Sequence, residues 1–350
     1  MGVRKGRIGE TMKAVVLDER GPAGVSWRDF PDPTPVAGES ILKVAAGSLN
    51  RVDLYMRDDG TGITHTLPQV MGVDAAGVVA KAEPGSGLRR GMKALLYSEA
   101  FCGKCRHCLA GDQPLCEAVK IMGEHRHGGF AEYVAMPTKC FFPLPDDADL
   151  EAAGALMTGH LTAWRMLFCK RALQPGESVL IVGIGGGVAV ACLQLAKLAG
   201  TRVFVSSSSD EKIARALAMG ADGGVNYARD QVSKAILDMS GGGVDMVIDS
   251  VGAASWSDSL KSLRRGGRLV TCGATTGSNP PADLQRLFIR QLEIYGSTGG
   301  SVGELRRLLD VFNRRLVKPA IDSQFAMSDV RTAFDRLQSG DQFGKISIVA

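Results

Sequence analysis

The chain has 350 residues, of which 45% are hydrophobic, enough apolar material for one large or two ordinary cores, and two domains are expected. Its net charge of +4 is spread over interleaved acids and bases, and short basic pairs such as Arg306 and Arg307 lack aromatic neighbours, which argues against a nucleic-acid partner. The longest apolar run, VLIVGIGGGVAVACL from Val179, is too short and too glycine-rich to cross a bilayer, so no membrane partner is expected.

The amino-terminal half has the texture of a β-rich domain. The first ten residues, MGVRKGRIGE, have neither an apolar core nor a cleavage signature, so an irregular start and a cytoplasmic location are expected. Short strands with glycine and proline punctuation follow up to about residue 150, as in MKAVVLDERGP from Met12 and GESILKVAAG from Gly38. This pattern predicts a compact β-rich domain.

A loop between residues 101 and 116, FCGKCRHCLAGDQPLC, contains four of the eight cysteines. The spacing C-x2-C-x2-C-x7-C, without a secretion signal, favours a metal over disulfides. Four thiolates close a zinc tetrahedron and leave no open position for a substrate, so a structural Zn2+ is predicted, with an iron–sulfur cluster or an empty loop as alternatives. The predicted ligands are Cys102, Cys105, Cys108 and Cys116.

The segment GEHRHGGFAEYV, from Gly123, places His125, Arg126 and His127 in a row. The simpler interpretation is a solvated turn before the strand FAEYV. The alternative is a basic patch at a substrate entrance, suited to an anionic tail such as a coenzyme A thioester.

From Pro175 onward, strand patterns alternate with helical patterns such as SDEKIARALAMG, for which Asp210 is the expected cap. Six such strands predict an α/β fold with a doubly wound parallel sheet of the nucleotide-binding type. The tail QFGKISIVA, from Gln342, reads as one more strand after a helix. The six strands are expected at 178–183, 202–206, 223–227, 244–250, 267–273 and 292–297.

The first of these strands runs into a glycine loop. Gly183, Gly186 and Gly187 are followed by Val188 and Ala189, one residue longer than the strict G-x-G-x-x-G pattern. A glycine turn can serve packing alone, but between a strand and a helix that open an α/β series it favours a dinucleotide pyrophosphate at the helix amino terminus.

The end of the second strand indicates which dinucleotide binds. An acid is typical there for NAD, whereas a 2′-phosphate needs small donors and a cation. The residues are Ser206, Ser207 and Ser208, with Lys212 one helical turn later, while Asp210 comes three residues late. NADPH is therefore predicted; the alternative is a polar turn with no role in choosing the cofactor.

Taken together, the β-rich half, the cysteine loop, the α/β half and the returning tail resemble the medium-chain dehydrogenase/reductase superfamily over nearly the whole chain. The resemblance implies a GroES-like catalytic domain at 1–157 with a zinc lobe near 102–116, a Rossmann NADP-binding domain at 158–298, and a return to the catalytic domain at 299–350. It also implies a homodimer or homotetramer.

Zinc alcohol dehydrogenases of that superfamily have a second, catalytic zinc. At the positions of its three ligands this chain has Asn50, Val73 and Thr158, and Asp74 stands where a glutamate follows the usual histidine. Valine cannot bind zinc, and asparagine and threonine are poor ligands for it. One structural Zn2+ per chain is therefore expected, with no catalytic metal.

The pattern is similar to the quinone oxidoreductase and enoyl reductase branch, whose N-x-x-D motif matches Asn50 and Asp53 and whose G-V-D-A-A-G motif matches 72–77. The resemblance implies hydride transfer from NADPH to a C=C bond conjugated to a carbonyl, as in an enone or enoyl thioester, or to a quinone. Asn50 is the expected amide donor to the substrate carbonyl and Tyr55 the expected proton source, although Tyr55 could equally be a packing aromatic.

Further cofactor contacts follow from position within that family. Arg51 matches a pyrophosphate contact, while Tyr227 and Lys212 match contacts on the phosphate side. His160 lies near the reacting centre or is a core residue. The residues that match the border of the nicotinamide half are Thr162, Phe343, Gly344 and Lys345.

Two other functions stay open for the small-molecule substrate site. One is a zinc-type alcohol dehydrogenase acting on alcohols or aldehydes, which two zinc ions per chain would support. The other is an NADPH-binding protein without turnover.

Overall fold

The computed structural model describes residues 10–60 and 66–350, so the irregular start predicted for residues 1–10 lies outside the described part except for Glu10. Two compact units form: unit 1 contains Met1–Thr158 and Ile321–Ala350, and unit 2 contains Gly159–Ala320. The second junction therefore lies at Ala320 and not at residue 298. The reason is that α10 (Val302–Asn313) packs within unit 2, where Glu304 pairs with the buried Arg165 at 2.9 Å.

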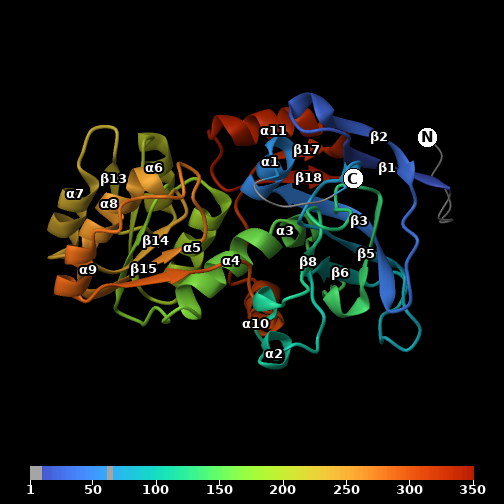
Figure 1. The fold of residues 1–350 in the computed structure, drawn as a ribbon, viewed down its shortest axis with the longest axis horizontal. Coiled ribbons are helices and arrows are strands. Elements are labelled where there is room, and N and C mark those ends of the chain that lie inside the picture. The colour runs from blue at the N-terminus through green and yellow to red at the C-terminus, as the bar shows by residue number, and fades with distance from the viewer. Residues whose placement is uncertain (1–9, 61–65) are drawn as a thin grey trace. The chain divides into compact units, whose positions relative to one another are not determined.

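Unit 1 is built mainly on two sheets. The larger has the strand order β10-β6-β5-β3-β18-β17, with β9 also paired to β3, and the smaller has the order β2-β1-β4 (Figure 1). A short pair, β7 and β8, lies apart from them. The strands are β1 (Thr11–Leu17), β2 (Val25–Pro31), β3 (Glu39–Leu49), β4 (Gln69–Val70), β5 (Ala76–Lys81), β6 (Lys93–Leu96), β7 (Glu99–Ala100), β8 (Lys120–Ile121), β9 (Tyr133–Pro137), β10 (Phe141–Pro143), β17 (Ile321–Ala326) and β18 (Lys345–Val349).

The last strand brings the end of the chain to the middle of unit 1. Strand β18 pairs antiparallel with β3, so that Ile346 lies opposite Leu49, and the predicted carboxyl-terminal strand is confirmed. Asn50 follows β3 directly and precedes α1, where its backbone N–H donates to the Asp53 carboxylate at 2.8 Å. Lys345 and Asn50 thus become neighbours although 295 positions separate them. The helices of the unit are α1 (Arg51–Asp58), α2 (Arg106–Leu109), α3 (Leu150–Gly154) and α11 (Val330–Ser339).

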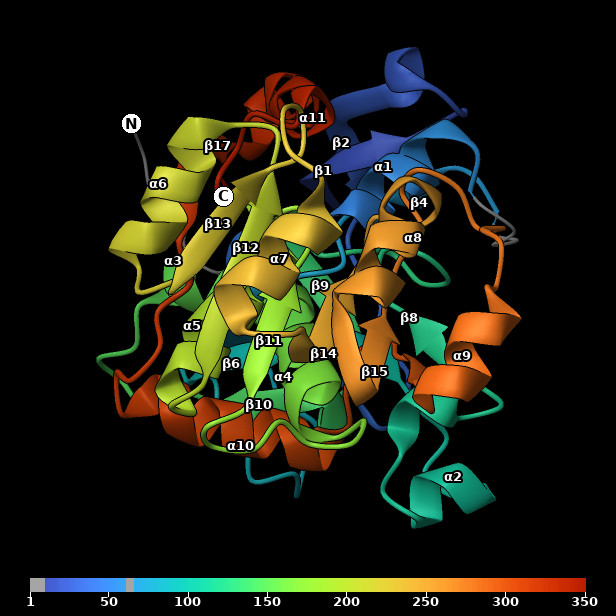
Figure 2. The same ribbon diagram turned by 90° about the vertical axis from the view of Figure 1, so that its left-hand side faces the viewer.

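Unit 2 is a parallel sheet with the strand order β13-β12-β11-β14-β15-β16, the order of dinucleotide-binding domains. Figure 2 looks onto this unit, with α7 and α8 in front of the strands. The predicted α/β fold is confirmed. Its elements are α4 (Met157–Phe168), which begins in unit 1, β11 (Ser178–Ile181), α5 (Gly187–Leu198), β12 (Arg202–Ser207), α6 (Asp210–Ala218), β13 (Gly223–Asn226), α7 (Val232–Ser240), β14 (Val244–Asp249), α8 (Ala253–Ser262), β15 (Leu263–Thr271), α9 (Leu284–Arg290), β16 (Glu293–Gly296) and α10.

One apolar cluster joins the strands of unit 2 to two of its helices. Leu180, Phe204 and Val247 of the sheet pack with Ile236 of α7 and Leu260 of α8, and all five are buried. Burying side chains of this size stabilises the fold by about 1.5–3 kcal/mol each. In the described residues, no helix is both long enough and apolar enough to pass through a membrane.

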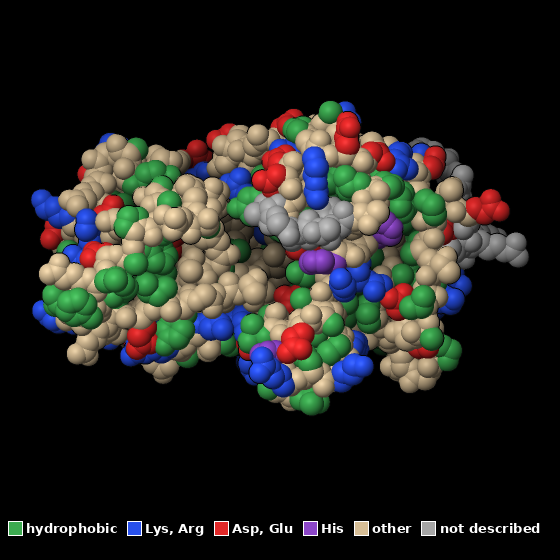
Figure 3. Space-filling view, viewed as in Figure 1, with side chains coloured by type: hydrophobic (Ala, Val, Ile, Leu, Met, Phe, Trp, Pro, Cys, Tyr) green, Lys and Arg blue, Asp and Glu red, His purple; other side chains and the backbone are tan. Residues whose placement is uncertain are grey.

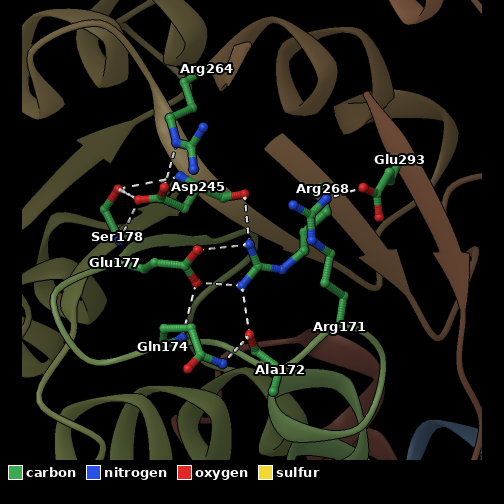
Figure 4. A network of polar contacts seen from close by, with 9 residues as sticks. All are labelled: Arg171, Ala172, Gln174, Glu177, Ser178, Asp245, Arg264, Arg268 and Glu293. Carbon is green, nitrogen blue, oxygen red and sulfur yellow. Dashed lines mark hydrogen bonds and ion pairs between the residues drawn. The ribbon is translucent and has the colours of Figure 1, made fainter. Parts of the chain in front are cut away.

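A network of hydrogen bonds and ion pairs links the amino ends of the unit 2 strands (Figure 4). The Arg268 side chain is only 1% exposed and pairs with Glu177, while Asp245 pairs with Arg264. Ser178, the first residue of β11, donates its backbone N–H and its hydroxyl to Asp245 at 2.8 Å each. Because nucleotide sites of such sheets lie beyond the carboxyl ends of the strands, this network has a structural role.

Candidate functional site

The four cysteines of the loop at 101–116 come together in unit 1. Their sulfur atoms all lie within 4.8 Å of one another, and the Cys102 and Cys108 sulfurs are 3.9 Å apart. Sulfurs bound to one zinc ion at about 2.3 Å would be separated by about 3.8 Å. Across residues 10–60 and 66–350, no other group of three or more His, Cys, Asp or Glu side chains is close enough to share an ion. The donor set and its spacing fit a structural Zn2+.

Backbone amides prepare this loop for metal binding. Cys102 Sγ accepts hydrogen bonds from the amides of Lys104 at 3.4 Å and Cys105 at 3.3 Å, and these bonds lower the pKa of Cys102 to about 6. The amide of Cys108 likewise lowers the pKa of Cys105, whereas burial raises the pKa of Cys108 to about 12. Zinc binds thiolates, so a metal entering the loop displaces the remaining protons.

A second group, here called the Asp74 cluster, occupies the positions expected for catalytic zinc ligands. Asp74 is fully buried, and its Oδ1 accepts from Thr158 N at 3.0 Å and from Thr158 Oγ1 at 2.5 Å. Its Oδ2 accepts from Ser48 Oγ at 2.7 Å and from Asn50 Nδ2 at 2.9 Å. Lys345 Nζ lies 3.4 Å from the same oxygen. Asn50 and Thr158 therefore meet around a carboxylate.

The orientation of the Asn50 amide is fixed by its neighbours. Its Oδ1 accepts from Lys345 Nζ, which can only donate, and its Nδ2 donates to Asp74 and to the carbonyl of Ser48 at 3.0 Å. Both amide hydrogens are thus used inside the cluster. The predicted role of Asn50 as a direct donor to a substrate carbonyl does not agree with this geometry, because the amide has no hydrogen left to offer.

Lys345 completes the cluster in the same way. Its ammonium group donates to the carbonyl of Leu49 at 3.1 Å as well as to Asn50 and Asp74, so its three hydrogens have three acceptors. The side chain is 3% exposed. Lys345 was expected to border the nicotinamide, and the structure shows it as the internal counter-charge of Asp74. Sequence reasoning missed this pair because β18 brings the two residues together only in the fold.

Two further carboxyl groups lie buried beside the Asp74 cluster. Burial raises the pKa of Asp53 to about 8 and that of Glu124 to about 7. The charge of Asp74 adds to the effect on Asp53, while the backbone N–H of Asn50 and the charge of Lys345 oppose it. Asp53 therefore takes part in the capping box of α1, whose N-cap is Asn50, as a carboxyl group that holds its proton near neutral pH.

Helix α1 presents the remaining predicted residues of unit 1. Arg51 is exposed at its first position, and Tyr55 is half-buried one turn later. Within the described part of the chain, the Tyr55 hydroxyl makes no hydrogen bond to protein, so it can serve a ligand. Its assignment as a proton source, and that of Arg51 as a pyrophosphate contact, stay predictions.

The glycine loop of unit 2 lies where the sequence predicts it. Gly183 follows β11 with φ +70°, a backbone conformation that favours glycine, and Gly186 caps α5, which begins at Gly187. A Cβ at Gly186 would meet nothing within 4 Å, so this face of the loop is open. Val188 follows in the first turn, whose free amides suit a phosphate. The residues present fit a dinucleotide pyrophosphate.

The predicted cofactor contacts Ser207 and Ser208 lie at the end of β12, next to Ser209, which has an unpredicted role as a helix cap. Ser207 is buried and its Oγ accepts from the amide of Ser209, whereas Ser208 is exposed. Ser209 caps α6 by accepting from the Lys212 amide at 3.3 Å, so the expected cap, Asp210, is instead the first residue of the helix.

The Asp210 carboxylate is held by the residue that the sequence analysis missed. Arg229 donates to it from two nitrogens, at 2.7 and 2.8 Å, and Asn226 donates at 2.8 Å. Asn226 and Arg229 hold the pKa of Asp210 below its usual range. Arg229 comes only two positions after Tyr227, which is 53% exposed, and its place in the loop after β13 is the signal that could have identified it.

The residues predicted to lie near the nicotinamide or the reacting centre are mostly buried. Thr162 is buried in α4, and His160 is buried two residues earlier, with its Nε2 3.0 Å from Gln194 Oε1, as expected for a core histidine. Phe343 is buried and its amide donates to Asp322 at 3.0 Å, while Gly344 has φ +107°. Their cofactor roles stay predictions.

The basic segment 125–127 lines a hollow of about 730 Å³ in unit 1. Histidine and basic side chains are visible on this face in Figure 3. Arg126 pairs with Glu39, and His125 and His127 each accept a backbone N–H at Nδ1, at 3.3 Å. Burial lowers the pKa of both histidines, so neither adds a positive charge near pH 7. The segment is therefore mostly engaged with protein groups and is not simply a solvated turn, and its role at a substrate entrance stays a prediction.

Comparisons with known proteins agree with the fold. The family described as alcohol dehydrogenase GroES-like domain matches residues 36–146, and that described as zinc-binding dehydrogenase matches residues 187–314. An alcohol dehydrogenase of Geobacillus stearothermophilus is 30% identical over 96% of this chain and 98% of its own.

Solved structures give the same result. A NAD-dependent alcohol dehydrogenase has a TM-score of 0.93 and 36% identity, covering 97% of this chain and 100% of its own. A thermostable alcohol dehydrogenase from Pyrobaculum aerophilum has a TM-score of 0.87 and 32% identity with the same coverage. The similarity therefore extends through both units.

Proposed function

Since the chain belongs to the zinc-containing medium-chain dehydrogenase/reductase superfamily, we propose that it is an NADPH-dependent reductase that works without a catalytic zinc. Its substrate carries a C=C bond conjugated to a carbonyl, as in an enone or an enoyl thioester, or is a quinone. The observation that supports this proposal is the Asp74 cluster, in which Asn50 and Thr158, at two of the expected zinc-ligand positions, donate hydrogen bonds to the Asp74 carboxylate, and Asn50 also accepts one from Lys345.

The composition of the cluster disfavours zinc on chemical grounds. Zinc prefers thiolate, imidazole and carboxylate ligands, whereas the three expected positions offer an amide, a hydroxyl and the buried side chain of Val73. The carboxylate that is present is fully hydrogen-bonded and faces an ammonium group. Alcohol oxidation depends on a Lewis acid that lowers the pKa of the alcohol, so the cluster fits that reaction poorly.

An activated alkene or quinone needs less help from the protein. A dinucleotide held at the glycine loop would supply a hydride for the electrophilic β-carbon of such a substrate. Tyr55 is the proposed donor of the proton that completes the reduction at the α-carbon, and water restores its hydroxyl. Asn50 is a positioning residue in this proposal: it joins the end of β3, Asp74 and Lys345 at the start of α1.

The preference for NADPH rests on the end of β12. Asp210 comes three residues after the usual position of the acid at an NAD site, and Arg229 holds both of its oxygens, so it is not free to accept from ribose hydroxyls. Ser207, Ser208 and Lys212 supply hydroxyls and a cation for the extra phosphate. Equal affinity for NADH and NADPH, unaffected by Lys212→Ala, would refute this part of the proposal.

Alcohol dehydrogenation is the second candidate, because the relatives named above are alcohol dehydrogenases, one of them NAD-dependent. The two candidates differ in what they require: alcohol oxidation needs an additional metal near Asn50, and alkene reduction does not. A protein that binds NADPH without turnover would be inactive on both classes of substrate.

The test is a substrate panel with the purified chain. NADPH oxidation is followed with a cyclic enone, an enoyl thioester and a quinone, and NAD+ and NADP+ reduction with primary and secondary alcohols. Reduction of one of the first three is expected, with kcat about 100-fold lower in Tyr55→Phe and unchanged in the control Tyr133→Phe. Activity confined to the alcohols would refute the proposal.

A further inference from the structure

The Asp210–Arg229 pair is built from three elements at one edge of the unit 2 sheet. Asp210 opens α6, Asn226 ends β13 and Arg229 lies in the following loop. Arg229 binds both carboxylate oxygens, and Asn226 Nδ2 donates to Oδ1 and to the carbonyl of Ser208 at 3.2 Å. The guanidinium is thereby tied to the exposed serine that was predicted to face the 2′-phosphate.

The pair is exposed enough to exchange partners. Its side chains are 63% and 62% exposed, and ion pairs of this kind add little to stability. A guanidinium offers two parallel N–H donors that match a phosphate as well as they match a carboxylate. A phosphate with nearly two negative charges therefore competes well for Arg229.

Removing Arg229 has two effects: it deletes a contact to the phosphate, and it leaves the negative charge of Asp210 unbalanced. With Arg229 present, the negative charge of Asp210 is balanced and a second anion can approach. Without it, the carboxylate repels a 2′-phosphate and is free to accept from ribose hydroxyls. Arg229 thus favours binding of NADPH, whereas a free Asp210 would favour binding of NADH.

Building on the proposed NADPH preference, we infer that Arg229 and Asp210 together determine cofactor choice: Arg229 binds the 2′-phosphate of NADPH and keeps Asp210 from binding the ribose of NADH. This assigns Arg229 a specificity role in addition to Lys212 and Tyr227.

Equilibrium binding of NADPH and NADH, followed by nicotinamide fluorescence, tests this without any need for turnover. Arg229→Gln is expected to weaken NADPH binding about tenfold or more and to tighten NADH binding. Asp210→Asn combined with Arg229→Gln is expected to regain part of the NADPH affinity and to lose the gain for NADH. Arg28→Gln is the matched control, because Arg28 also binds both oxygens of an exposed carboxylate, that of Asp18, in unit 1.

The outcomes separate this inference from the proposal on which it rests. If the unchanged chain binds NADH as tightly as NADPH, the proposed NADPH preference fails and the inference fails with it. If NADPH is preferred but Arg229→Gln leaves the ratio of the two affinities unchanged, only the inference is overturned. Circular dichroism spectra of the variants, compared with that of Arg28→Gln, show whether a change in affinity reflects loss of fold.

Discussion

Lys345 and Asp74 form a buried ion pair whose partners are 3% and 0% exposed. Removing one partner of such a pair leaves the other charge buried and costs about 3–5 kcal/mol. Lys345→Met is therefore expected to lower the free energy of unfolding of unit 1 by that amount in urea titrations.

A double-mutant cycle shows whether that cost comes from the pair. Asp74→Asn with Lys345→Met removes both charges and keeps a polar group for Ser48 and Thr158, so the double variant should be less destabilised than the sum of the single variants by at least about 1 kcal/mol. Strictly additive effects would mean that the two residues do not interact as the structure shows.

Asp53 makes stability depend on pH. Burial raises its pKa to about 8 in the folded chain, whereas an unfolded chain loses this proton near pH 3.9. From about pH 4 to about pH 8 the folded state binds the additional proton, so the free energy of unfolding falls as pH rises, by at most about 1.4 kcal/mol per pH unit from this group. Asp53→Asn keeps an oxygen that can accept from the backbone N–H of Asn50 and removes the ionisable carboxyl group.

The pH prediction is measured as a slope. Urea unfolding at several pH values from about 5 to about 8 should show a smaller loss of stability with rising pH in Asp53→Asn than in the unchanged chain. Glu124, whose pKa is raised to about 7, contributes in the same direction, and Glu124→Gln tests it separately. Identical slopes in all three proteins would contradict the burial argument.

We expect the order of the cysteine loop to depend on a bound metal. Four thiolates on one ion would cross-link a segment in which the structure shows only α2 and a short 3₁₀ turn (Gln113–Leu115). Cys105→Ser is expected to abolish zinc binding and to speed amide exchange across residues 102–116 at least about tenfold, with β3 and β11 unaffected. Cys169→Ser, which changes an exposed thiol outside the loop, serves as the control. Unchanged exchange in the loop would show that the metal does not order it.

Elements that depend on local pattern were predictable from the sequence. The strands of unit 2, the turn at Gly183 and the cysteine spacing lie in short stretches where hydrophobic period, glycine and ligand spacing are visible. The cap of α6 was misplaced by one residue, because Asp210 and Ser209 are both good caps and only the ion pair with Arg229 decides between them.

The hydrogen-bond network within the Asp74 cluster could not be predicted from local sequence patterns. The Asp74 cluster combines residues from the end of β3, the segment just before β5, the start of α4 and the start of β18, and no local pattern encodes the hydrogen bonds among them. Family resemblance identified Asn50 and Thr158 as site residues. It did not predict that Asn50 donates both of its side-chain amide hydrogens to protein groups. The junction at Ala320 likewise depends on where α10 packs.

At the scale of the whole molecule, the expected homodimer or homotetramer has a candidate surface in unit 2. Strand β16 pairs with β15 at one end of the sheet, and its Ile294 is 39% exposed. Nearby α9 exposes Leu284 and Phe288 at 69% and 70%. An open strand edge beside exposed apolar side chains can pair with a second copy of the same edge.

Sedimentation equilibrium tests this surface. Ile294→Lys places a charge on the edge strand, as monomeric sheet proteins commonly do, and is expected to shift the chain toward monomer. Val36→Lys alters an equally apolar residue that is 66% exposed in unit 1 and should leave the association state unchanged. An association state unaffected by Ile294→Lys would exclude this edge as the interface.

We predict that the chain holds one zinc ion, in the cysteine loop, and none at the Asp74 cluster. Elemental analysis of protein purified without added metal measures this number. One equivalent of zinc per chain is predicted, falling to none in Cys105→Ser. Two equivalents, with one retained in Cys105→Ser, would show that the chain binds a second zinc outside the cysteine loop and would favour alcohol dehydrogenation over the reductase proposed here.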